Sequence, residues 1–327
     1  MDEENRSTVS EGTVKPVQCE RNSKRPGRKL RNRIFAIIFM GILLTVLGQL
    51  LGMRIMSLLT DALGDTIKSF PNGFIQNFRA YSCFIGIHIL VLLYVLVSRR
   101  EVLKRFFHGY CSNTWKMLFA GVLAGLICNG IGIGAAVLHG DLSFRYSGME
   151  PWTVAVLFVA VFIQSAAEEL VCRGYMLHYI NDSYNSPVLA VVISGAVFSL
   201  LHVFNTGVTV FSLINIAIFG IAMAIAVCKC GSIWFAMAFH AGWNFCQAFI
   251  FGLPNSGSPA TYSIFAISQE KASIMYDTVF GVEGAVTTTV ICVVLCILLY
   301  ICGNKRKETA AEDSTNGISE EKEYYGS

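Results

Sequence analysis

The chain has 327 residues, of which 54% are hydrophobic and only 14% are charged, with a formal net charge of +3. A soluble globular domain carries charge on about 25% of its residues, so this composition excludes an ordinary soluble fold. Charged residues are scarce because long apolar runs lack them, not because they are thinned out evenly along the chain. Several of these runs reach the roughly 20 residues that a membrane-spanning helix needs. We therefore expect an all-α fold, a polytopic membrane helical bundle.

About eight candidate spans follow one another along the chain, and we expect each to be a transmembrane helix. Their approximate ranges are 34–56, 81–98, 117–138, 152–178, 188–204, 208–227, 232–252 and 285–302. The third span contains small or amide residues that allow membrane helices to approach closely, namely Gly125, Asn129, Gly132 and Gly134. The expected organisation is one membrane domain at 34–302. It is flanked by polar tails at 1–33 and 303–327, whose composition predicts disorder.

Lys and Arg residues set the expected orientation, because cytoplasmic loops carry an excess of them. They gather at 21–33, at 99–116 and at 305–307. With an even number of spans, all three clusters fall on one side of the membrane. We therefore expect a multi-pass protein of the plasma membrane with both termini in the cytoplasm.

Several ionisable side chains lie deep inside the predicted spans, where they are costly and by default mark a functional site. Glu168, His202 and His240 lie on three different spans. At 1.5 Å per residue, they lie roughly 18, 21 and 12 Å from the cytoplasmic ends of those spans. These depths fall near the middle of a core about 30 Å thick. We therefore expect three helices to bring these groups into one cavity.

The spacing on the fourth span separates two roles. Glu169 and Arg173 are four residues apart with the acid first, which is the favoured order for an ion pair. Glu168 is rotated by about 100° from Glu169, so it can face a different neighbour and keep a free carboxylate.

The same spacing places polar groups on shared faces elsewhere. His240 and Asn244 share one helix face, and Phe198 and His202 share another. A carboxylate or a metal can remove a proton from water, while His or Asn stabilises the oxyanion of a tetrahedral intermediate. Glu168, His202 and His240 also form a His₂Glu set, a common arrangement for catalytic zinc. The residues therefore predict a hydrolytic site and leave the cofactor open between none and zinc.

Three segments resemble the motifs of the CPBP family (CAAX protease and bacteriocin-processing, also called Abi), which are EExxxR, FxxxH and HxxxN/D. The matching residues are Glu168-Glu169-Leu170-Val171-Cys172-Arg173, Phe198-x-x-x-His202 and His240-x-x-x-Asn244. They occur in that order on separate hydrophobic helices, and the resemblance covers about residues 115–252. It implies an eight-helix intramembrane endopeptidase. The related eukaryotic enzyme, the CAAX prenyl protease of the Rce type, removes the last three residues of prenylated CAAX proteins.

The resemblance also implies roles for individual residues. Glu168 would activate water, and His202, His240 and Asn244 would bind that water or the oxyanion. The supporting residues would be Glu169 and Arg173, with Phe198 packing beside His202. Whether the mechanism is glutamate-dependent or uses a metal bound by Glu168, His202 and His240 stays open. The expected partners are membrane lipid and a peptide or lipidated protein substrate, with no nucleic acid.

Two other classes of protein fit the same residues. A membrane immunity or scaffolding protein of this fold would bind a partner without cleaving it, and bacterial family members have been linked to bacteriocin immunity. A transporter is the third class, since buried Glu and His also serve proton relays. Other membrane proteases fit less well, because the chain has no H-E-x-x-H zinc motif. Asn215, Gln164 and Ser165 are expected to make hydrogen bonds between helices.

Overall fold

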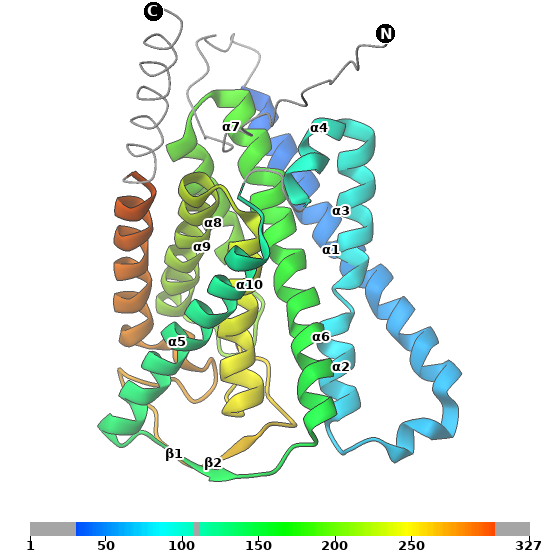
Figure 1. Ribbon diagram of the computed structural model, residues 1–327, viewed down its shortest axis with the longest axis vertical. Helices are drawn as coiled ribbons and strands as arrows, with labels where there is room; N and C mark the ends of the chain where they lie inside the picture. The colour runs from blue at the N-terminus through cyan, green and yellow to red at the C-terminus, as the bar shows by residue number, and fades with distance from the viewer. Residues whose placement is uncertain (1–30, 108–111, 305–327) are drawn as a thin grey trace, which may run out of the picture.

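The computed structural model describes residues 31–107 and 112–304. It is a bundle of long helices with a small two-stranded sheet at one end (Figure 1). The predicted tails lie almost entirely at 1–30 and 305–327, outside the described residues. The first helix begins at Arg31, slightly before the predicted start at 34.

The bundle begins with α1 (Arg31–Leu63), which is followed by α2 (Phe74–Ser82), α3 (Ile85–Ser98), α4 (Arg100–Leu103) and α5 (Trp115–His139). The chain continues through α6 (Pro151–Glu169), the π-helical segment η4 (Leu170–Leu177) and α7 (His178–Tyr184). The last helices are α8 (Pro187–Leu200), α9 (Val210–Cys230), α10 (Ile233–Phe245), its π-helical extension η5 (Cys246–Ile250) and a C-terminal helix, Val286–Asn304. Short 3₁₀ turns are η2 (Gly64–Ser69), η3 (Lys104–Phe106) and η6 (Val282–Gly284).

Within the described ranges, six helices are long and apolar enough to cross a membrane. They confirm the all-α polytopic bundle. The count of eight is not confirmed, because the predicted span at 188–204 corresponds to α8, which has only 14 residues, and the segment at 232–252 is not among the six. The second predicted span begins earlier than expected, since α2 and α3 together run over Phe74–Ser98.

Polar residues at the ends of the apolar runs fix where several helices begin. The side chains of Thr114, Ser186 and Ser232 each accept a hydrogen bond from a main-chain N–H in the first turn of the following helix. Thr209 and Ser212 satisfy each other's main-chain donors at the start of α9. These caps replace the partners that the first N–H groups of a helix lack.

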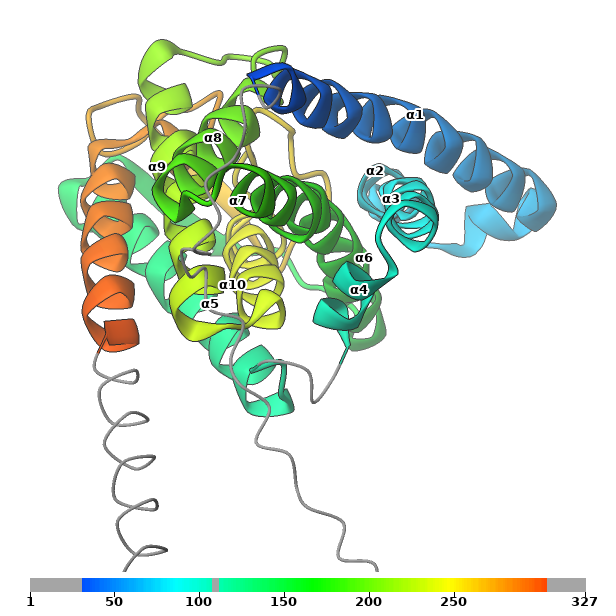
Figure 2. The same ribbon diagram turned by 90° about the horizontal axis from the view of Figure 1, so that it is seen from above.

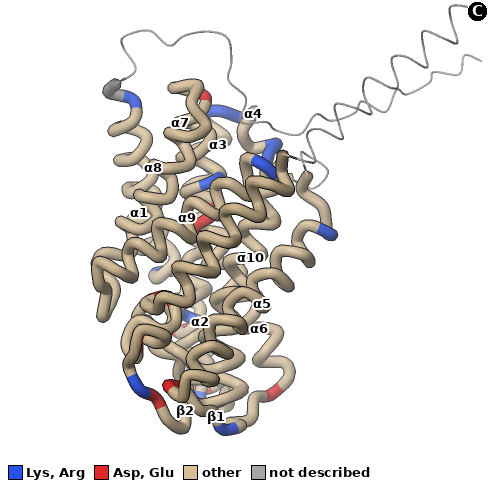
Figure 3. The backbone as a smooth tube through the Cα atoms, turned by 90° about the vertical axis from the view of Figure 1, so that its left-hand side faces the viewer, with Lys and Arg blue, Asp and Glu red and all other residues tan. Residues whose placement is uncertain are grey.

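The strands lie at the end of the bundle opposite the start of α1 (Figure 1). β1 (Leu142–Tyr146) pairs antiparallel with β2 (Phe265–Glu270) and links the chain after α5 to the segment that follows α10. The start of α1 and the end of the C-terminal helix both lie toward the other end. Lys and Arg residues gather at that end around α4, as Figure 3 shows.

Close helix contacts hold the centre of the bundle together. α5 crosses α10 at Gly125, where an added Cβ would lie 2.1 Å from the Phe239 carbonyl oxygen. One turn further on, Asn129 Nδ2 donates to Gln247 Oε1 at 2.9 Å. The expectation that small residues in this helix allow close approach is therefore confirmed at Gly125. It is wrong at Gly134, where an added Cβ would meet open space.

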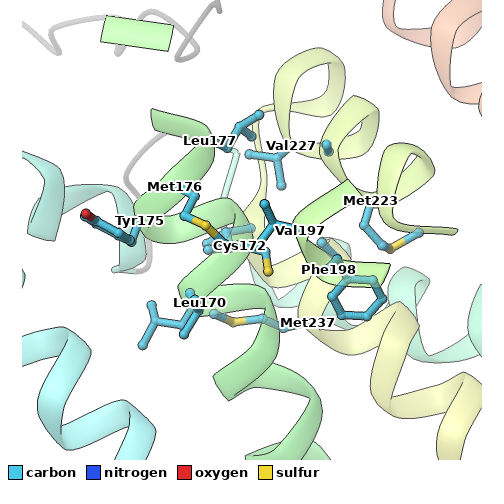
Figure 4. Close-up of a cluster of buried hydrophobic side chains, with 14 of the residues drawn as sticks. Leu170, Cys172, Tyr175, Met176, Leu177, Val197, Phe198, Met223, Val227 and Met237 are labelled. Carbon is cyan, nitrogen blue, oxygen red and sulfur yellow. The ribbon is translucent and has the colours of Figure 1, made fainter. Parts of the chain in front are cut away.

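A hydrophobic cluster packs against the segment that carries the first motif. Side chains from η4, α8, α9 and α10 meet there, and those labelled in Figure 4 include Leu170, Cys172, Met176, Val197, Phe198, Met223, Val227 and Met237. Seen from above in Figure 2, α6, α8, α9 and α10 form the middle of the bundle, with α1 at one edge and the C-terminal helix at another. This core fixes the helices that position the candidate site.

Candidate functional site

Glu169 joins two of the predicted site residues through a single oxygen atom. Its Oε1 accepts from Arg173 Nη1 at 3.1 Å and from His240 Nδ1 at 3.1 Å. The side chains of Glu169 and Arg173 are both 0% exposed, so the predicted ion pair is present and fully buried. The contact with His240 comes from α10, far away in sequence. It fixes the ring with Nδ1 toward Glu169 and leaves Nε2 for another partner.

Arg173 extends the same cluster to α8 and α9. Its Nη2 donates to the Gly220 carbonyl oxygen at 2.7 Å, and its guanidinium lies 4.6 Å from the centre of the Phe198 ring. An added Cβ at Gly220 would lie 3.1 Å from Nη2, so this close approach depends on a residue without a side chain. The guanidinium therefore ties three helices together around Glu169.

Glu168 belongs to a second chain of hydrogen bonds. Its Oε1 accepts from Gln164 Nε2 at 2.6 Å, and Gln164 Oε1 accepts from Asn244 Nδ2 at 2.9 Å. Ser165 Oγ donates to the same Gln164 oxygen at 3.1 Å. Gln164 and Ser165 thus link α6 to α10, as expected. The amide of Asn244 orients Gln164, which in turn holds one oxygen of Glu168.

Within the described part of the chain, the other carboxylate oxygen of Glu168 has no hydrogen-bond partner, although it is buried. This Oε2 lies 3.8 Å from His240 Nε2, which is beyond a direct hydrogen bond but allows one water to contact both atoms. A buried carboxylate oxygen without a partner is costly. The pair therefore forms a polar position suited to a bound water or a substrate group.

His202 lies just beyond the end of α8 rather than inside a helix. α8 ends at Leu200, so the predicted span to 204 was too long, and the main-chain N–H of His202 bonds to the Ser199 oxygen three residues back. The imidazole Nδ1 lies 2.8 Å from the Phe198 carbonyl oxygen. Because a carbonyl only accepts, Nδ1 donates and Nε2 stays available.

Phe198 contacts both imidazoles. Its ring centre lies 4.9 Å from that of His202 and 5.7 Å from that of His240. Its ring also contacts the Arg173 guanidinium, which lies 4.6 Å from the ring centre. The expectation that Phe198 packs beside His202 is confirmed.

A small cavity opens between these groups, with about 20 Å³ available to the centre of a water-sized sphere. A cavity needs roughly 10–15 Å³ by that measure to hold one water. The lining residues are Phe198, His202, Asn215, Ile216, Phe219, His240, Trp243, Ser256, Glu283 and Thr288. The cavity is therefore lined by both polar and aromatic side chains. Glu168 borders it only through its neighbour His240.

Glu283 is an acid of this cavity that the sequence did not reveal. It lies in η6, just before the C-terminal helix, and is only 9% exposed. Its Oε2 accepts from the main-chain N–H and the hydroxyl of Ser256, both at 2.7 Å. Asn215 Nδ2 donates to the Glu283 carbonyl oxygen at 2.8 Å, and Asn215 Oδ1 accepts the expected interhelical bond from Thr289 Oγ1 at 2.6 Å. Burial raises the pKa of Glu283, although the bond from the Ser256 hydroxyl acts in the opposite direction.

The geometry does not assemble the predicted metal set. Both imidazoles have Nδ1 engaged and Nε2 available, which is how metal-binding histidines are usually held. Yet within residues 31–107 and 112–304 no three His, Cys, Asp or Glu side chains come together as a group able to hold a metal ion. As placed, Glu168, His202 and His240 therefore do not fit zinc.

Both helices that carry paired motif residues change to π-helix directly after them. η4 follows Glu168 and Glu169, and η5 begins two residues after Asn244. Such widened turns occur frequently at functional sites. In η4 the wide turn carries Arg173 into contact with both Glu169 and α9.

Fold and site together define a multi-pass helical membrane protein with a buried cluster of acids and imidazoles beside a small cavity. Residues 150–246 match the family model described as type II CAAX prenyl endopeptidase, Rce1-like. The match covers the segment that carries all three motifs, and the resemblance drawn from them is confirmed. The family suggests an intramembrane endopeptidase.

The chain is also similar to the uncharacterized protein YyaK of Bacillus subtilis (strain 168). The two are 26% identical over 210 residues, which cover 60% of this chain and 69% of the relative. The wider core boundaries at 115–252 stay a prediction.

Proposed function

We propose that this protein is an intramembrane endopeptidase in which Glu168 activates the water that attacks a peptide bond. The observation that carries the proposal is the unpartnered Oε2 of Glu168, 3.8 Å from His240 Nε2. A water between these atoms has an acceptor for its proton on one side and an imidazole to orient it on the other. A general base must be within hydrogen-bond reach of the proton that it removes.

The reaction on this geometry begins with attack of the water oxygen on the carbonyl carbon while Glu168 takes a water proton. Glu169 holds the His240 ring through Nδ1 at 3.1 Å, so its Nε2 keeps its direction. His202 presents Nε2 to the same cavity from the α8 side. Protonated imidazoles there would donate to the oxyanion, as preorganised donors do in acyl transfer. The carbon–nitrogen bond then breaks and the leaving nitrogen takes a proton.

The substrate class follows from the family and from the surroundings of the site. The matched family is described by its action on CAAX prenyl proteins, which combine a peptide and a lipid. The cavity adds aromatic walls from Phe198, Phe219 and Trp243. We therefore propose a membrane-associated, exported or lipidated peptide as substrate, with membrane lipid as the surrounding solvent.

Purified protein in lipid nanodiscs tests the proposal with two quenched fluorescent peptides of one sequence, with and without a farnesyl group on a CAAX cysteine. We expect cleavage by the unaltered protein and at least a 10²-fold loss in Glu168→Gln, the lower bound for one general base. Glu150→Gln is the matched control, because Glu150 is an exposed acid at the start of the same helix. Full cleavage by Glu168→Gln would overturn the site assignment. No cleavage of either peptide by the unaltered protein would favour a non-catalytic role.

The same assay decides the cofactor. We expect a strong chelator to leave the cleavage rate unchanged, because the described side chains form no three-ligand group. Loss of activity that returns on adding zinc would show that the metal-free mechanism is wrong.

A further inference from the structure

Glu283 lines the cavity beside the candidate site from the turn η6. It shares this cavity with His202 and His240, whereas Glu168 lies next to the cavity beside His240. The two acids come from distant parts of the chain. A peptide bond held against the imidazoles would therefore lie in a cavity that also contains the Glu283 carboxyl group.

The Glu283 side chain is held in one orientation. Both donors from Ser256 bind Oε2, which leaves Oε1 for the cavity. The backbone of the turn is fixed as well, because Asn215 Nδ2 bonds to the Glu283 carbonyl and Thr288 Oγ1 donates to the Val282 carbonyl at 2.6 Å. Ser256 has a φ of 46°, a left-handed conformation that is uncommon for a residue other than glycine. Such a well-determined side chain suits a role at a fixed position.

Peptide hydrolysis needs a proton at the leaving nitrogen as well as a base for the water, since an amine anion is too poor a leaving group. Two carboxyl groups in different surroundings divide these tasks in several enzymes, one ionised and one protonated. Burial of Glu283 favours its protonated form.

We propose that Glu283 is the general acid of the site and donates the proton from its Oε1 to the leaving nitrogen. The inference rests on the proposed function. The water oxygen bonds to the carbonyl carbon and Glu168 gains a water proton. The carbon–nitrogen bond breaks, and the nitrogen takes the Glu283 proton as it leaves as an amine. Transfer of the proton on Glu168 to Glu283 through cavity water restores both groups, so no further reactant is needed.

A leaving group that needs no proton separates this role from a structural one. The same peptide is prepared with its scissile amide and with an aryl ester at that position, because a phenolate leaves without protonation. For Glu283→Gln we expect kcat on the amide to fall by about 10²-fold or more, the range of one general acid. We expect kcat on the ester to fall less than about tenfold, with KM little changed for both.

Two variants serve as controls. Ser256→Ala keeps the Glu283 carboxyl and one of its two bonds to Ser256, and we expect a smaller loss with the same preference for the ester. Glu150→Gln, an exposed acid outside the cavity, should cleave both substrates like the unaltered protein.

Equal losses on amide and ester in Glu283→Gln would overturn the proposal, and so would an unchanged rate on the amide. If Glu283→Gln is not recovered as folded protein, Glu283→Asp is measured with the same two substrates. Selective loss on the amide then supports the assignment, and equal loss refutes it. Failure of the unaltered protein to cleave the amide is a separate result, which refutes the proposed function itself.

Discussion

Removing either partner of the Glu169–Arg173 pair should unfold the protein as well as inactivate it. Both side chains are 0% exposed, and their atoms meet at 3.1 Å. Glu169→Leu leaves the guanidinium without its carboxylate and bound to the Gly220 carbonyl, and Arg173→Met leaves a buried carboxylate. Breaking a buried pair from one side typically costs about 3–5 kcal/mol.

That cost predicts a large shift in thermal stability. At about 1.5 °C per kcal/mol, from an unfolding entropy of about 2.1 cal/mol/K for each of the 327 residues, each single variant should lose about 5–8 °C in Tm. The measurement is thermal unfolding in detergent, followed by the fluorescence of a thiol-reactive dye and repeated in nanodiscs.

The double variant Glu169→Leu with Arg173→Met is the decisive control. It removes both charges and fills the space with apolar side chains, so most of the lost stability should return. Cleavage should not return, because His240 still lacks the acceptor for Nδ1 that Glu169 supplies. Single variants with unchanged Tm would refute the argument, as would a double variant whose loss equals the sum of the two singles.

Three further predictions follow from other contacts. Asn244→Ala should lower kcat by about 10²-fold with unchanged folding, as misplacement of a catalytic group does, because Asn244 Nδ2 holds Gln164 and through it one oxygen of Glu168; a loss below about tenfold in the peptide assay would contradict that role. Gly125→Val should reduce the yield of monodisperse protein in size-exclusion chromatography, because its Cβ would lie 2.1 Å from the Phe239 carbonyl oxygen. Gly134→Ala is the control and should give a normal yield, because an added Cβ there meets open space. Reporter fusions at the first and last residues should both read as cytoplasmic, and an external C-terminus would show that the number of spans is odd.

The sequence predicts those parts of the site that depend on spacing along one helix. The Glu169–Arg173 pair follows from four-residue spacing, and the contact of Phe198 with His202 follows from the same rule. The sequence also predicts that α6 and α10 meet, because ionisable side chains, which are costly inside a membrane, lie at similar depths in the two helices. It does not predict the contacts between them. Spacing along one helix pairs Glu169 with Arg173 and cannot show that the same Glu169 oxygen also binds His240.

Glu283 illustrates a different limit. It lies outside every apolar run, so a search for ionisable groups inside spans does not find it. It becomes part of the cavity because the chain after α10 folds back and Ser256 and Asn215 fix the turn that carries it. Only its position two residues before the last apolar run was available as a signal. The short α8 was missed for a related reason, because the apolar run continues past Leu200 where the helix has already ended.

The π-helical segment η4 has a consequence for how relatives of this chain are aligned and redesigned. A π turn holds about one residue more than an α turn, so a single-residue deletion between Glu169 and His178 can be absorbed by conversion to ordinary α-helix. A single-residue deletion before Glu168 falls in ordinary α-helix, which has no extra residue to lose. It would rotate both acids by about 100°. Natural length variation in this helix is therefore expected after the acids, and an alignment should place its gap there.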